Sequence, residues 1–154
     1  MRPLRWILAA VVLVTGCGSS DTSSCIELRE PEDQASGLHV LTDEAFEYQT
    51  YPPTSGAHIA GPTPAGVFDT TVALPIQVRL LEAGGVMIQY DPAAIDPASL
   101  HGLADDLTVV APGADLPDPV VVTAWTWKLS CSEVDFERIE RFSLERRDDA
   151  PGLD

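Results

Sequence analysis

Hydrophobic and polar positions alternate in several short segments after residue 37, and each segment predicts one element of secondary structure. Residues 76–90 alternate apolar and polar side chains, reach a pair of glycines, and continue into a run of strand-forming residues, which predicts a β-hairpin. Asp96 and Pro97 are typical of a helix start, and the apolar spacing that follows predicts a helix over residues 97–105.

Two further strands and a second helix complete the predicted domain. Residues 107–111 and 119–129 are rich in β-branched side chains and are separated by a turn-prone segment. Trp125 and Trp127 occupy alternate positions of the second strand, so we expect both indoles on one face. Residues 133–147 have helical apolar spacing after a serine N-cap. The pattern predicts an α+β domain, a small antiparallel sheet with both helices packed on one side.

A proline-rich segment lies before the predicted hairpin. Residues 51–66 contain four prolines and three glycines, a density that neither a helix nor a sheet tolerates. We therefore expect an ordered or functional loop. Residues 38–41, before this loop, predict a short strand.

The amino terminus has the three parts of a bacterial export signal. Two arginines precede an apolar core of nine residues, far fewer than the about 20 that a spanning helix needs. Residues 14–17, Val-Thr-Gly-Cys, resemble the lipobox of bacterial lipoproteins, in which the cysteine is acylated, with palmitate for example, and the peptide before it is removed. We therefore expect residues 1–16 to be a signal peptide and Cys17 to carry the lipid. A simple secreted protein is the alternative.

This processing predicts both location and organisation. The protein is expected to be extracytoplasmic, held on a membrane of the bacterial cell envelope through its lipid. Residues 17–37 form the lipidated cysteine and a flexible tether, residues 38–147 a single domain, and residues 148–154 a tail. Removal of the signal peptide takes away two arginines and no acids, so the formal charge of −15 becomes −17. Nucleic acid is therefore excluded as a partner.

Two cysteines remain after lipidation, Cys25 and Cys131. In an oxidising compartment an isolated pair is most simply a disulfide. Two free, redox-active thiols are the alternative, but no Cys-x-x-Cys spacing favours them.

Several motifs follow one another in the order of a known family. They are Pro52–His58, Gly66–Phe68, Val78–Gly84, Val86–Pro92 and Thr123–Trp125. In this order they resemble a bacterial family known only as a domain of unknown function, number 3105. Family members usually have two histidines four residues apart around a glutamate, whereas this chain has Arg79 and Ala83 there and keeps only Glu82.

His39 and His58 also stand where the family tends to have histidine, on either side of the loop's start. Together with Glu82 they could form a pocket or a reduced metal site, because imidazole and carboxylate are good transition-metal ligands. Three ligands do not complete the usual four-coordinate set. We therefore expect His58 to hydrogen-bond the loop backbone and His39 to lie at a strand edge, with no metal and no cofactor.

The sequence thus favours a non-catalytic binding or interaction module over an enzyme. Its ligand, a protein or a small molecule, is not identified by any motif. The alternative is a metal-dependent enzyme or metal-binding protein with a reduced site at His39, His58 and Glu82.

The lipid anchor gives the first testable prediction. Protein recovered from native membranes should have an acylated amino terminus at Cys17, because the signal, apolar core and lipobox are in the order that the processing requires. Mass spectrometry of the intact chain checks this. An unmodified amino terminus at Met1 would contradict it.

Overall fold

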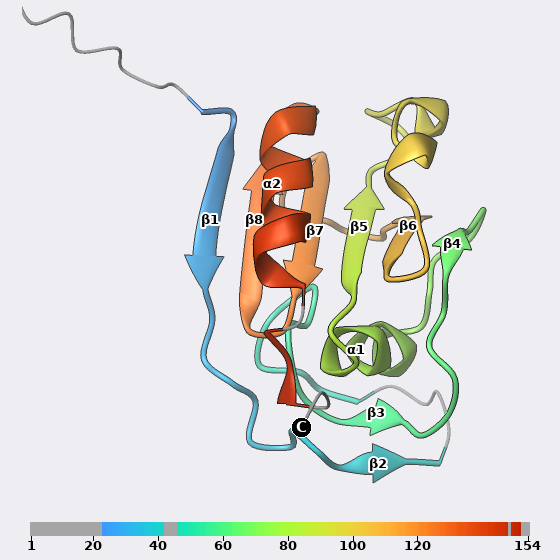
Figure 1. The fold of residues 1–154 in the computed structure, drawn as a ribbon, viewed down its shortest axis with the longest axis vertical. Coiled ribbons are helices and arrows are strands. Elements are labelled where there is room, and N and C mark those ends of the chain that lie inside the picture. Colours follow the sequence, from blue (N-terminus) through green and yellow to red (C-terminus); the bar gives the residue numbers. More distant parts are fainter. Residues whose placement is uncertain (1–22, 42–45, 148, 152–154) are drawn as a thin grey trace, which may run out of the picture.

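A mixed six-stranded sheet forms the centre of the domain (Figure 1). The structure is a computed structural model, which describes residues 23–41, 46–147 and 149–151. The predicted signal peptide and Cys17 lie outside these residues. The sheet has the order β1-β8-β7-β5-β6-β4, from the strands β1 (Cys25–Arg29), β4 (Gly66–Val67), β5 (Val86–Tyr90), β6 (Thr108–Pro112), β7 (Val120–Ala124) and β8 (Trp127–Cys131).

A second, two-stranded sheet and short helices surround the main sheet. The small sheet pairs β2 (His39–Val40) with β3 (His58–Ile59). The helices are α1 (Leu74–Glu82), α2 (Phe136–Arg146) and two 3₁₀ turns, η1 (Pro97–Ser99) and η2 (His101–Leu103). None of the helices in the described part of the chain has the length and hydrophobicity needed to cross a bilayer.

The α+β class is confirmed, but the sheet is larger than predicted and not purely antiparallel. β5 pairs antiparallel with β7 and parallel with β6, and β4 is also parallel to β6. The parallel pairs arise because the chain crosses over between them, through α1 after β4 and through η1 and η2 after β5. β1, for which the sequence predicted no strand, forms the edge beside β8.

Helices cover both faces of the sheet: the two predicted helical regions, now η1 with η2 and α2, pack into one core cluster, and α1, which the sequence did not predict, packs into a second cluster on the other face. Every residue of β5 is buried. Val86 and Ile88 face a core cluster that includes Phe142 of α2, whereas Met87 faces a second cluster that includes Leu81 of α1. Neighbouring strand residues point to opposite faces, so β5 requires cover on both.

The predicted hairpin over residues 76–90 is wrong in its first half, which is the helix α1. A proline at its start and a glycine after its end are typical of a helix. Gly84 (φ +81°) donates its N–H to the carbonyl of Leu81, and Gly85 donates to that of Leu80. These are the two hydrogen bonds of a Schellman motif. The glycine pair therefore ends a helix and does not form a hairpin turn.

A hairpin does form later in the chain, within the single strand predicted over residues 119–129. β7 and β8 pair antiparallel and are joined by Trp125 and Thr126, the latter with φ +59°. Because the chain reverses between the two tryptophans, they do not share a face. Trp125 packs into the cluster of α1, and Trp127 packs against the cluster of α2.

Both predicted helices are shorter in the structure. Residues 97–105 form η1 and η2, capped by the Asp96 side chain, since a glycine at position 102 disfavours a continuous α-helix. The helix predicted over residues 133–147 starts at Phe136, because Asp135 is the N-cap and accepts a hydrogen bond from the Arg138 N–H.

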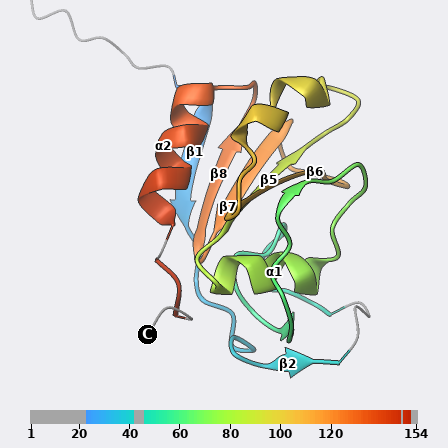
Figure 2. The same ribbon diagram turned by 45° about the vertical axis from the view of Figure 1, so that its right-hand side comes forward.

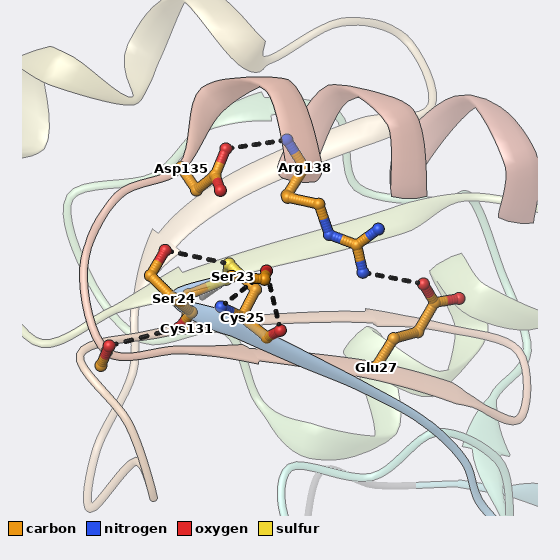
Figure 3. Close-up of a disulfide and its surroundings, with 8 residues drawn as sticks. Ser23, Ser24, Cys25, Glu27, Cys131, Asp135 and Arg138 are labelled. Atoms are coloured by element: carbon orange, nitrogen blue, oxygen red, sulfur yellow. Dashed lines mark hydrogen bonds and ion pairs between the residues drawn. A yellow bond between two sulfur atoms is a disulfide. The ribbon is translucent and has the colours of Figure 1, made fainter. Parts of the chain in front are cut away.

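The edge strand β1 is tied to the domain by a disulfide and by ion pairs (Figure 3). Cys25 and Cys131 form the predicted disulfide, between residues that are opposite in the β1–β8 pair. Glu27 accepts hydrogen bonds from Arg138 and Arg146 of α2. The Arg146 guanidinium in turn lies 3.7 Å from the centre of the Trp127 ring, so charge and cation–π contacts join β1, α2 and β8.

The end of α1 gives the second prediction. Gly84→Ala should lower the free energy of unfolding by about 1–2 kcal/mol, because an L side chain is strained at this positive φ. Gly102→Ala is the matched control, since an added Cβ there meets nothing within 4 Å. Denaturant unfolding compares the two. Equal free energies of unfolding for the two variants would contradict the role of Gly84 in ending α1.

Candidate functional site

The proline-rich loop is buried at residues 52–58 and is held by side chains from other segments. Tyr48 donates its hydroxyl to the carbonyl of Ala57 at 2.7 Å. Burial raises the pKa of Tyr48 to about 12, and the nearby Asp33 carboxylate adds to this shift, so the phenol stays neutral and able to donate. Ser55 accepts a hydrogen bond from the Asp33 N–H. The loop therefore gains the order that ladder bonds do not provide.

A buried ion pair fixes the start of the same loop. Lys128 of β8 donates to the Glu30 carboxylate at 2.8 Å and to the Tyr51 carbonyl at 3.1 Å. Thr54 donates its hydroxyl to the same carboxylate. Lys128 is 6% exposed, and a buried charge is stable only when it is paired in this way. Through Lys128, the main sheet fixes the position of the loop, and the loop in turn positions His58.

The small parallel sheet places two histidines side by side. His39 of β2 and His58 of β3 are register partners, and the His58 N–H donates to the Leu38 carbonyl. Their rings lie 4.7 Å apart in an edge-to-face arrangement. His58 is fully buried, whereas His39 is exposed. One imidazole is therefore fixed by the core and the other faces solvent.

Helix α1 brings Glu82 to the histidines from the other side. One carboxylate oxygen, Oε2, lies 2.7 Å from Nε2 of His58. The candidate ligand atoms of His39, His58 and Glu82 all lie within 4.8 Å of one another. The structure therefore joins the three site residues that the sequence named, although they come from two strands and a helix. The third histidine, His101, lies exposed on η2 and outside this group.

The contact between His58 and Glu82 has the length of a hydrogen bond but not its direction. Nε2 is completely buried and has no hydrogen-bond partner among the described residues, even though the Glu82 oxygen is 2.7 Å away. The oxygen must lie to the side of the ring axis along which Nε2 donates or accepts. The other ring nitrogen, Nδ1, lies 3.5 Å from the Gly56 carbonyl, at the outer limit of a hydrogen bond.

The three side chains carry donor atoms of the kind that bind transition-metal ions. Two ligands bound at about 2.0–2.1 Å in tetrahedral geometry lie about 3.3 Å apart, so the separation of 2.7 Å between His58 Nε2 and Glu82 Oε2 would have to widen when an ion binds. A metal-binding histidine also usually directs its second nitrogen at a carbonyl, which is where Nδ1 of His58 lies. Two imidazoles and a carboxylate suit zinc, copper, nickel or iron. The expected contact of His58 with the loop backbone is present as well, through Nδ1 and the Gly56 carbonyl.

Arg79 is the neighbour that the sequence did not assign to the site. Its Nη1 lies 3.4 Å from Glu82 Oε2, and its Nε donates to the Gly61 carbonyl at 2.9 Å. The sequence indicated only that an arginine cannot ligate a metal. Its spacing of three residues from Glu82 on a helix is the signal for this ion pair, and it was hidden because the segment reads as a strand.

A mixed sheet with helices on both faces, joined to a cluster of two histidines and a glutamate, defines a small α+β domain with a candidate metal site. The chain belongs to the family described as protein of unknown function (DUF3105), whose model matches residues 39–152. No curated protein and no solved structure matches the chain.

Proposed function

We propose that this protein is an exported, lipid-anchored binding module of the bacterial cell envelope, and that its ligand is a transition-metal ion held by His39, His58 and Glu82. One observation supports the proposed metal ion: the buried Nε2 of His58 touches a carboxylate oxygen and yet has no hydrogen-bond partner in the described chain. An unpaired buried polar atom costs about 1–3 kcal/mol, and a metal ion would remove that cost.

The position of the cluster supports an anchored binding protein. β1, which lies within the segment predicted as tether, starts at one end of the sheet, eight residues after Cys17 (Figure 1). α1, β2 and β3 lie at the opposite end, as Figure 2 also shows. A chain held through Cys17 would therefore present the cluster away from its own anchor, where a soluble donor or acceptor of the metal can reach it.

Binding is proposed over catalysis because each imidazole and carboxylate of the cluster is used as a ligand. Three protein ligands leave a coordination position open, which is also the arrangement of catalytic zinc sites. Catalysis would need a further acid or base beside that position, and the residues named for the site offer no such group.

Metal titration gives the third prediction. Protein purified without a histidine tag should bind one Zn²⁺ or Co²⁺ per chain, and His58→Ala should weaken binding by more than about 100-fold. The loss should be this large because even residues that only orient ligands are worth about 10–100-fold. Calorimetric titration of both proteins provides the measurement.

Two further variants make this test specific. His101→Ala is the matched control, because this exposed histidine lies outside the cluster, and it should bind like the wild type. Glu82→Gln keeps the shape of a partly exposed side chain while removing its charge, and it should weaken binding without unfolding the core, as circular dichroism would show. Wild-type protein that takes up no metal would overturn the proposal.

The residues that replace the family's histidines give the fourth prediction. Arg79→His together with Ala83→His should raise metal affinity at least about tenfold, because the change adds two imidazoles on one side of α1 and removes a cation next to Glu82. Arg79→Gln separates the two effects, since it removes the charge without adding a ligand. An unchanged affinity in the double variant would show that positions 79 and 83 do not face the site.

A further inference from the structure

The Arg79 side chain connects the candidate metal site to a neighbouring pocket. The pocket has a volume of about 220 Å³ and is lined by Ile59, Ala60, Gly61, Pro62, Ile76 and Arg79. Five of these residues are uncharged and largely apolar, so the guanidinium is the single charged group in the lining. The same guanidinium lies 3.4 Å from Oε2 of Glu82.

Arg79 has hydrogen-bonding capacity that the described chain does not use. A guanidinium has five N–H donors. Nε donates to the Gly61 carbonyl and one Nη1 N–H donates to Glu82, so three donors are left without a partner among the described residues. The side chain is 28% exposed, so an incoming ligand can reach it. A carboxylate matches the planar, forked geometry of these donors.

Local charge favours the same class of ligand. A divalent metal beside Glu82 would leave one positive charge, and Arg79 adds a second next to it. A monoanion would therefore be attracted to the open coordination position, even in a chain whose formal charge is −15. The other residues that line the pocket carry no charge, so the part of the ligand that lies against them should be apolar.

The geometry points to a small organic carboxylate with a short apolar chain as the second ligand of this site. Its carboxylate pairs with Arg79 beside the metal, and its apolar part lies against Ile59, Pro62 and Ile76. At roughly 30 Å³ for each water-sized unit, the pocket accommodates a molecule of about seven such units. This inference rests on the proposed metal site and adds to it the class of molecule that the protein binds together with the metal.

Titration of full-length, Co²⁺-loaded protein with butyrate is the fifth prediction and tests this inference. Butyrate should bind in a saturable way and change the visible absorption spectrum of the metal. Acetate should bind about tenfold more weakly, because it lacks two methylene groups that the pocket would bury. 1-Butanol and n-butylamine, which have the same apolar part without the carboxylate, should not bind measurably.

Two arginine variants complete the test. Arg79→Gln should keep its metal and lose at least about tenfold in butyrate affinity, whereas Arg141→Gln, an exposed position on α2, should behave like the wild type. Equal butyrate affinity in Arg79→Gln and wild type, or metal-loaded protein that butyrate does not saturate, would overturn this inference and leave the metal site standing. Wild-type protein without metal would overturn both proposals.

Discussion

The two-sided burial of β5 is the constraint on which the rest of the structure depends. A strand with every residue buried needs apolar cover on each face of the sheet. α2 with η1 and η2 supplies the cover on one face, and α1 with Trp125 supplies it on the other. Because α1 must lie against Met87 and Val109, its last turn lies at the end of the sheet, next to the proline-rich loop. The position of Glu82 is therefore a consequence of core packing.

The loop at the site is ordered by side chains, and this explains why a segment so rich in proline can hold a histidine in a fixed place. Prolines remove backbone donors, so the loop forms few ladder bonds of its own. Tyr48, Asp33 and Lys128 replace those bonds. Of these, Lys128 comes from the main sheet and is stabilised by Glu30, so His58 is anchored to the same sheet that positions α1. The two sides of the cluster thus share one rigid support.

Much of this architecture could be predicted from the sequence where a signal is local. Composition or a short motif is enough to predict four features: the class of fold, the proline-rich loop, the short strand before that loop, and the cysteine pair. The helix α1 could not be predicted by periodicity, since Gln77 is buried and the segment alternates like a strand. The glycine pair after it has two readings, a hairpin turn or a helix cap, and only tertiary packing decides between them. The parallel pairing of β5 with β6 depends on contacts between distant residues, which no local pattern contains.

The residues of the candidate site could be predicted from the sequence, but their arrangement in space could not. His39, His58 and Glu82 could be named from the resemblance and from their place beside the loop, whereas their convergence depends on the β2–β3 register and on the packing of α1. Arg79 shows why the geometry matters. The resemblance suggested a lost ligand at this position, but in the structure the Arg79 guanidinium lies next to the Glu82 carboxylate. Without a metal, Arg79 supplies the positive charge that keeps Glu82 paired beside a buried imidazole. The guanidinium therefore places a positive charge beside both Glu82 and the buried ring of His58.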